Sequence, residues 1–376
     1  MGHNGMNDAT GFVDASKEAH ARLAHMQTVL DGFVNRGEVD GAAVAVAWRG
    51  QQIAEFTSGF AAPQHPARFD TLWPLASISK VYTATAVMRL VERGLLSLAQ
   101  PVRSVLPEFT GDGREQITLR HLLTHTSGIV YESPEMVARL EAQQPIDAMI
   151  DEAYTYPLLF TPGTRLSYSD YNYALAGRMA AITLGVDFPS LIEQEVLVPG
   201  GLHDTFMPPP RTQYERLAHV IGTAAYGTPG SMYNADYALQ LAHPAFGTVS
   251  TVSDLLQFGL RFTRHDTTRL LSGASVRVMT TDQTGGHTPG ASFTDGTDLP
   301  RPWAIGFSLK GTTGSGPDLF SPSSFGHGGA SGCMLMVDPE QELAVAFVSN
   351  KHALTGREAF SRRQQAVCNV AAAALT

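Results

Sequence analysis

The sequence of 376 residues is poor in cysteine, in charge and in long apolar runs. Its two cysteines, Cys333 and Cys368, are too few for a disulfide framework, and neither lies in a spacing typical of a metal site. The net charge of −9 and the lack of basic runs argue against nucleic acid as a partner. The longest apolar runs, 42–48 and 343–349, have the length of strands and fall far short of a membrane span. Residues 1–24 are polar and lack the apolar segment of a secretory signal, so we expect a soluble, cytoplasmic protein.

Lysine is also scarce, whereas arginine is abundant. Only four of the 26 basic residues are lysines, namely Lys17, Lys80, Lys310 and Lys351. An arginine keeps its proton in proteins, but a lysine that is removed from water can lose its proton and accept one from a neighbour. In a chain that uses arginine for its surface charge, each lysine is therefore a candidate for acid–base chemistry.

Strand-like segments occur near both ends of the chain, and the middle has mostly helical patterns broken by Pro/Gly loops. The expected strands are 42–48, 51–59, 303–310, 333–337 and 342–349, and the expected terminal helices are 16–36 and 360–375. We predict an α+β fold in which an antiparallel sheet, built from both ends and flanked by the terminal helices, carries a mainly helical lobe. The sheet lobe is expected to comprise residues 1–80 and 246–376, and the helical lobe residues 81–245.

Ser77-Ile78-Ser79-Lys80 is the main candidate for chemistry. These residues open a predicted helix that ends before Gly94. Positions i and i+3 share a helix face, so the serine hydroxyl and the lysine amine can approach each other. A neutral lysine can take the serine proton, although the spacing alone also fits a serine cap with a surface lysine one turn later. The sequence has no G-x-S-x-G elbow, Walker A, H-E-x-x-H or G-x-G-x-x-G motif that would indicate another chemistry.

Two further segments follow the S-x-x-K motif. Residues 166–173 bring tyrosines and an aspartate after a Pro-Gly loop, and residues 324–332 are rich in glycine before a predicted strand. In this order, the three segments resemble the serine β-lactamase and penicillin-binding-protein superfamily. More narrowly, the chain resembles the class C β-lactamase-like serine hydrolases, which include esterases, D-aminopeptidases and acyltransferases. The resemblance covers nearly the whole chain, through 75–80, 90–98, 117–128, 161–163, 168–170, 249–254, 326–329 and 338–339.

This resemblance implies the family's fold, with an active site at the junction of the two lobes and a reaction through an acyl-enzyme. Ser77 corresponds to the nucleophile, and Lys80 corresponds to its partner one turn later. Tyr168 corresponds to the residue that shuttles the proton between the nucleophile and the leaving group. The resemblance implies no metal and no organic cofactor, and it implies a small-molecule ester or amide as the partner.

The glycine-rich segment corresponds to the strand that edges the active-site cleft. His327, Gly328 and Gly329 are expected to contact the substrate. The backbone N–H groups of Ser77 and Ala330 would form the oxyanion hole.

Two residues depart from the family pattern. Asp170 stands where the family usually has asparagine, and a carboxylate beside Lys80 would favour its ammonium form. We therefore expect Tyr168 to act as the general base, as a phenolate stabilised by Lys80. His327 stands where the family usually has lysine, and a neutral histidine is a weaker anchor for a substrate carboxylate.

These departures predict a carboxylesterase that acts on small neutral esters, with Asp170 as a further substrate-binding residue. A D-amino-acid amidase or D-aminopeptidase is the alternative, since a cationic amine would suit Asp170, and a β-lactamase or acyltransferase of the same family also stays open. A catalytically silent scaffold is a third reading. Residues 131–156 are expected to shape specificity, whereas His121 and His125 are expected to have structural roles. No feature of the sequence indicates an oligomeric state.

Overall fold

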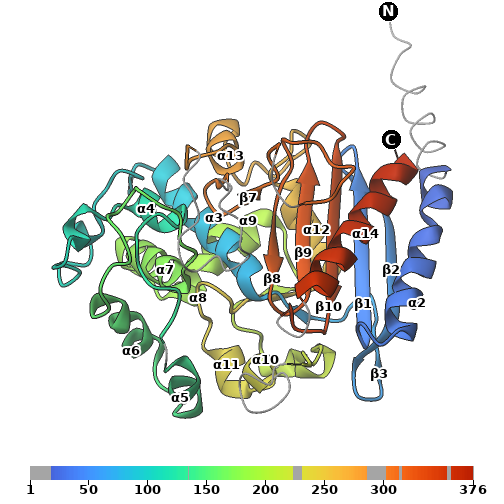
Figure 1. The fold of residues 1–376 in the computed structure, drawn as a ribbon, viewed down its shortest axis with the longest axis horizontal. Helices are drawn as coiled ribbons and strands as arrows, with labels where there is room; N and C mark the ends of the chain where they lie inside the picture. The colour runs from blue at the N-terminus through green and yellow to red at the C-terminus, as the bar shows by residue number, and fades with distance from the viewer. Residues whose placement is uncertain are drawn as a thin grey trace, which may run out of the picture.

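The sheet at the centre of the protein is built from both ends of the chain (Figure 1). The computed structural model describes residues 18–133, 135–222, 231–285, 302–312, 316–353 and 357–375. Seven strands lie in the order β3-β2-β1-β10-β9-β8-β7, and all neighbouring pairs are antiparallel. They are β1 (Gly41–Trp48), β2 (Gln51–Ala62), β3 (His65–Pro66), β7 (Ser308–Leu309), β8 (Phe325–Gly329), β9 (Cys333–Asp338) and β10 (Leu343–Ser349). The predicted α+β fold with its antiparallel sheet is confirmed.

The helices lie on both faces of this sheet and in a group beside it (Figure 1). Those with extensive contacts to the sheet are α2 (His25–Asn35), α12 (Val252–Leu260) and α14 (Arg357–Leu375). The others are α3 (Ser79–Glu92), α4 (Leu119–Leu123), α5 (Met136–Glu141), α6 (Ile146–Asp151), α7 (Asp170–Leu184), α8 (Phe188–Ile192), α9 (Val198–Gly200), α10 (Ser231–Asn234), α11 (Asp236–Gln240) and α13 (Gly273–Thr280). The lobe boundaries at residues 80 and 246 stay a prediction.

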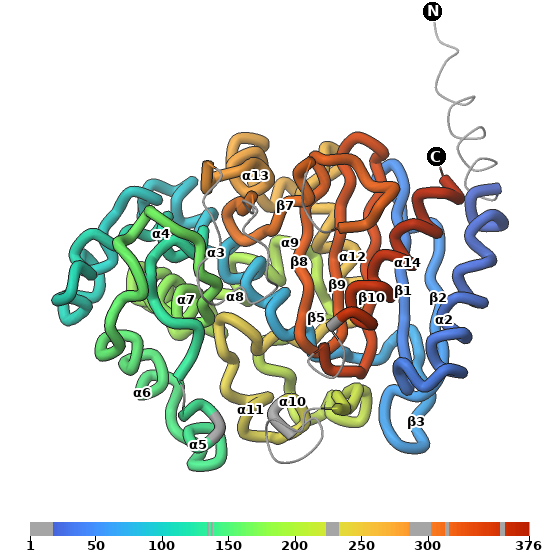
Figure 2. Tube along the Cα trace, viewed as in Figure 1, coloured from blue at the N-terminus to red at the C-terminus, as the bar shows by residue number. Residues whose placement is uncertain are grey.

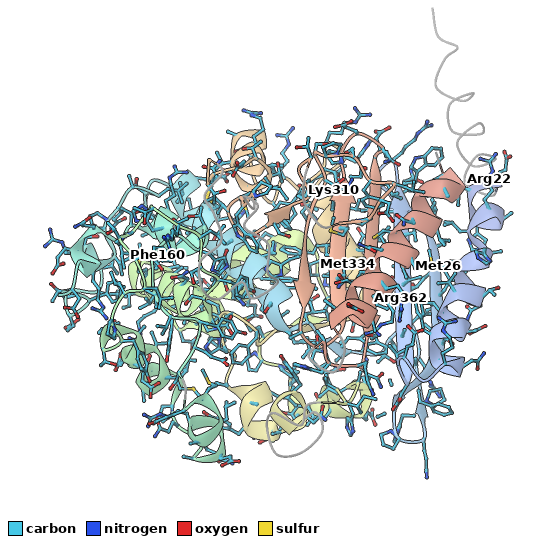
Figure 3. The ribbon with its side chains drawn as sticks, in the orientation of Figure 1. Arg22, Met26, Phe160, Lys310, Met334 and Arg362 are labelled. Atoms are coloured by element: carbon cyan, nitrogen blue, oxygen red, sulfur yellow. The ribbon has the colours of Figure 1, made fainter. Side chains whose placement is uncertain are left out.

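Alternation along the strands gives the sheet two apolar faces. Ala42, Val44 and Val46 of β1 pack with α2 and α14, which run side by side on one face (Figures 1 and 2). Met26 of α2 and Met334 of β9 belong to this layer (Figure 3). The intervening alanines of β1 face the other way, toward α12 and the larger core that extends to α3 and α7. Strand β1, buried from Gly41 to Ala47, therefore lies between two cores.

The expected strand at 303–310 is mostly wrong. Only Ser308–Leu309 forms a strand, β7, and Trp303 pairs with Ser308 as an isolated bridge. The chain turns back between them because Gly306 adopts a positive φ of 88° and the Ala304 N–H donates to the carbonyl of Phe307. The apolar residues of this segment thus line a tight turn instead of an extended strand.

No single helix within the described residues has the length and hydrophobicity to cross a membrane. One pair, Asp170–Leu184 with Phe188–Gly200, reaches those values only when joined, and its two parts are bent by 83°.

Candidate active site

Ser77 is held at the end of a strained connection between a short sheet and a helix. The strand β4 (Trp73–Pro74) pairs with β6 (Val249–Ser250), which also pairs with β5 (Thr205–Phe206). Ala76 then adopts a positive φ of 47°, which is unfavourable for a residue with a Cβ, and a 3₁₀ turn over Ala76–Ile78 leads into α3. Ser77 is partly exposed, whereas the residues around it from Leu72 to Leu90 are mostly buried. The chain therefore presents this one hydroxyl from an otherwise buried segment.

Lys80 lies one turn along and points its amine at that hydroxyl. Its Nζ is 3.1 Å from Ser77 Oγ and 3.1 Å from the carbonyl oxygen of Ala245, and the side chain is completely buried. The spacing predicted the approach of the two side chains. The spacing did not predict the contact with Ala245, whose carbonyl oxygen accepts a hydrogen bond from the amine.

Asp170 forms an ion pair with Lys80 at the start of α7. Asp170 Oδ1 lies 2.7 Å from Lys80 Nζ, and both side chains are buried. Burial lowers the pKa of Lys80, and the charge of Asp170 raises it and so offsets part of that effect. The sequence-based expectation that this carboxylate favours the ammonium form therefore holds as a direction, opposed by the larger effect of burial.

Tyr168 completes the group from the loop before α7. Lys80 Nζ lies 4.7 Å from the centre of its ring, and the Tyr168 hydroxyl lies near enough to the Ser77 side chain for the two to interact. Burial and the charge of Asp170 raise the pKa of Tyr168 well above its ordinary value. At rest the side chain is therefore a neutral phenol, which contradicts the phenolate expected from the sequence.

Strand β8 brings the glycine-rich segment alongside Ser77. A Cβ on Gly329 would lie 2.1 Å from the carbonyl oxygen of Leu75, so only glycine allows β8 to approach the segment that carries the nucleophile. This contact brings the end of β8 against the segment that carries Ser77, and the oxyanion hole formed by Ser77 and Ala330 stays a prediction. A Cβ on Gly328 would instead point toward Phe360 and Gln364 of α14, on the other face of the strand from Gly329, so the predicted substrate contact of Gly328 could come only from its backbone.

His327 is a neutral, buried histidine on the same face of β8 as Gly329. Its Nδ1 lies 2.7 Å from the carbonyl oxygen of Gly328, so Nδ1 carries the proton and donates it. Burial and the nearby Lys80 lower the pKa of His327 to about 3. The residue that replaces the family lysine therefore supplies no positive charge at neutral pH.

The motifs did not single out two residues beside the site. The carbonyl of Tyr131 accepts a hydrogen bond from the N–H of Asp170 at 2.9 Å, and the rings of Tyr131 and Tyr168 are 6.0 Å apart. Burial and the charge of Asp170 raise the pKa of the next residue, Glu132, to about 7, although Lys80 partly opposes the shift. Both residues lie in the segment expected to shape specificity, but nothing in their sequence context distinguishes them from an ordinary loop.

No group of three or more His, Cys, Asp or Glu side chains that could hold a metal occurs within the described parts of the chain. The polar groups gathered around Ser77 can form one arrangement for acyl transfer. It has a hydroxyl nucleophile with an amine and a phenol beside it, and the end of strand β8 lies against the same segment.

Comparisons with known proteins identify the family of this chain. The family model described as Beta-lactamase matches residues 26–367. Penicillin-binding protein 4 of Amycolatopsis lactamdurans is 29% identical over 348 residues, which cover 87% of this chain and 85% of that protein. Esterase EstB of Burkholderia gladioli is 34% identical over 218 residues, which cover 52% of this chain and 54% of that protein. The solved structure of EstCE1, described as a hydrolase with promiscuous acyltransferase activity, matches with a TM-score of 0.78 at 22% identity, over 94% of this chain and 99% of its own. The chain belongs to the β-lactamase family of serine hydrolases.

Proposed function

We propose that this protein is a carboxylesterase that hydrolyses small neutral esters through an acyl-enzyme on Ser77. The observation that carries the proposal is the position of Ser77 Oγ. Ser77 is partly exposed, its Oγ lies 3.1 Å from the buried amine of Lys80, and the Tyr168 hydroxyl lies near enough to interact with it. An alkoxide that forms there is stabilised by the neighbouring ammonium group, and the same neighbours can receive and return its proton.

The charges at the site favour a proton relay through Tyr168. Ser77 Oγ attacks the ester carbonyl while its proton passes to the Tyr168 oxygen, and Tyr168 passes its own proton to the departing alkoxide. This relay does not require a resting phenolate. Lys80, paired with Asp170, stabilises the negative charge that develops on both oxygens. The N–H groups of Ser77 and Ala330 stabilise the carbonyl oxygen, and a water molecule then hydrolyses the acyl-enzyme along the reverse path.

The preference for neutral esters rests on His327. A penicillin or a peptide C-terminus carries a carboxylate, and a histidine with a pKa of about 3 offers it no cation. The likeness to an esterase over half of the chain supports the same substrate class.

A second candidate is a D-amino-acid amidase, which Glu132 and Asp170 favour. Within the described residues, Glu132 has no ion pair or hydrogen bond through its side chain, and its carboxylate lies near Asp170 and Lys80. An ammonium group on the substrate would give Glu132 the partner that the described residues do not supply.

One set of assays separates these functions. We expect p-nitrophenyl acetate and butyrate to be hydrolysed with a higher kcat/KM than D-alanine p-nitroanilide or nitrocefin, and we expect Ser77→Ala to abolish the reaction. Preference for the anilide would favour the amidase, and preference for nitrocefin would favour a β-lactamase. A fluorophosphonate probe followed by peptide mapping tests the third alternative, a catalytically silent scaffold. A folded protein that is not labelled at Ser77 would support that alternative.

A further inference from the structure

His125 is buried beside the loop that carries Tyr168, with none of its surface exposed. It follows α4 and adopts a positive φ of 58°, a left-handed conformation that is uncommon for any residue with a Cβ. Its pKa is well below the ordinary value because of burial and the nearby Lys80, so the ring is neutral. The sequence suggested only a structural role for this residue.

Hydrogen bonds from His125 hold the backbone on both sides of Tyr168. The carbonyl oxygen of His125 accepts from the N–H of Ser167 at 2.8 Å. Its ring Nδ1 accepts from the N–H of Ser169 at 3.1 Å. The residues before and after Tyr168 are therefore both attached to the same histidine.

A second buried pair fixes which nitrogen of His125 carries the proton. Ser127 Oγ donates to Asn172 Oδ1 at 2.6 Å, which leaves the amide nitrogen of Asn172 facing His125 Nδ1 at 3.3 Å. Since Nδ1 thus accepts from two donors, its lone pair must be free and the proton must sit on Nε2. The neutral tautomer with its proton on Nε2 is the one that keeps the bonds from Ser169 and Asn172 to Nδ1.

The imidazole ring also fixes the plane of the tyrosine. The rings of His125 and Tyr168 are stacked, with centres 4.2 Å apart and planes 29° apart. Trp303 meets both rings edge-on, at 5.1 Å from His125 and 5.8 Å from Tyr168. These contacts restrain both the backbone and the ring plane of Tyr168, whose hydroxyl lies near Ser77.

Packing alone does not account for a histidine here. His125 Nε2 is buried and has no hydrogen-bond partner among the described residues, and a phenyl ring would fill the same space without that unpaired donor. The positive φ and the unpaired Nε2 donor both destabilise the fold at His125. Such destabilising features concentrate at functional sites. We propose that His125 is a positioning residue, which acts through Tyr168 by aiming its hydroxyl at Ser77 Oγ.

This inference rests on the proposed relay, and two variants test it. His125→Phe keeps a ring but removes the acceptor, whereas His125→Asn keeps an acceptor near the Ser169 N–H and tolerates a positive φ. The assay uses aryl and alkyl acetates whose leaving groups span a range of pKa values. A displaced Tyr168 accepts the Ser77 proton and protonates the leaving group poorly. We therefore expect His125→Phe to lower kcat about 10- to 100-fold for poor leaving groups and less for p-nitrophenol, which needs no proton to depart, with little change in KM. His125→Asn should recover part of the loss.

A double-mutant cycle supplies the decisive comparison. If His125 acts only through Tyr168, adding His125→Asn to Tyr168→Phe lowers kcat no further. A second loss equal to that in the wild-type background would overturn the inference, as would equal losses for good and poor leaving groups. If His125→Phe does not fold, as judged by its melting transition, the double-mutant cycle of His125→Asn with Tyr168→Phe still tests the inference. A wild type that hydrolyses no ester would instead overturn the proposed function and this inference with it, whereas Ser77-dependent hydrolysis with additive losses would overturn only the role of His125.

Discussion

At the scale of single residues, the charge on Lys80 depends on burial and on two carboxylates, of which Asp170 has the larger effect and Glu132 the smaller. Burial of the amine favours its neutral form, and Asp170 at 2.7 Å favours the ammonium form. In the relay through Tyr168, Lys80 stabilises negative charge and must be protonated. If Lys80 were itself the general base, it would have to be neutral. The two roles therefore respond in opposite ways to the loss of Asp170.

Asp170→Asn separates these roles by its pH profile. The substitution lowers the pKa of Lys80, so we expect the alkaline limb of kcat/KM for p-nitrophenyl acetate to move about one unit or more to lower pH. A gain of activity on the acidic limb would instead identify neutral Lys80 as the base. Glu132→Gln serves as the control, because it removes a nearby charge without breaking the ion pair.

Glu132 should make the preference for cationic substrates depend on pH. Its pKa is raised to about 7, so its carboxylate is mostly neutral at pH 6 and mostly charged at pH 8. We expect kcat/KM for acetylcholine, relative to the neutral isostere 3,3-dimethylbutyl acetate, to rise about three- to tenfold over that range, an electrostatic effect of about 1 kcal/mol. Neither substrate changes its charge between pH 6 and pH 8, so a change in the ratio reports a titrating group of the protein. The rates are measured in a pH-stat. The ratio should be constant in Glu132→Gln, and a ratio that still rises there would exclude Glu132.

The sequence could predict only part of this chemistry. The i, i+3 spacing was enough to expect Ser77 and Lys80 in contact, since that distance is a property of the helix itself. The neutral state of Tyr168 depends on how deeply tertiary packing buries its hydroxyl, which no local pattern reports. Glu132 acquires its raised pKa only because the fold brings Asp170 beside it.

At the scale of elements, the approach of β8 to the nucleophile segment can be tested with adjacent glycines. A Cβ at Gly329 would meet the Leu75 carbonyl oxygen at 2.1 Å, whereas one at Gly328 would meet its nearest atoms at 3.6 Å, an ordinary contact. We expect Gly329→Ala to push β8 away and separate the N–H groups of Ala330 and Ser77. The loss of kcat should be about 100-fold or more, the effect of losing an oxyanion-hole donor.

Gly328→Ala is the matched control, because it adds the same methyl group on the opposite face of the strand. Its kcat should stay within a few-fold of the wild type, with melting temperatures measured for both variants. Equal activity of the two variants would mean that the close approach of β8 is not needed for the reaction.

Element prediction succeeded where alternation was regular and failed where the backbone turned. The strands 42–48 and 342–349 were predicted nearly to the residue, because their apolar runs match strands buried on both faces. The segment 303–310 has the same apolar character, but Gly306 reverses the chain within it. The pairing of β1 with β10, which joins the two ends of the chain, was expected in outline, but its register of Ala42 with Ser349 comes from side-chain packing on both faces.

At the scale of the whole molecule, the sheet separates two cores, and each contains one cysteine. Cys333 belongs to the core that includes the candidate active site, and Cys368 belongs to the layer between the sheet and the terminal helices. Both are buried free thiols, and burial raises the pKa of each. A buried thiol of raised pKa reacts only when its surroundings open.

Thiol labelling can therefore show whether the two cores open together. Because β1, β9 and β10 contribute side chains to both cores, we expect them to unfold as one cooperative unit. In increasing concentrations of guanidinium chloride, N-ethylmaleimide should label Cys333 and Cys368 at the same midpoint, as measured by peptide mass spectrometry, and neither should react without denaturant. Cys333→Ser and Cys368→Ser assign each signal. Labelling of Cys368 well below the midpoint for Cys333 would show instead that α2 and α14 detach first, and activity measured in parallel would then report whether the site survives without that layer.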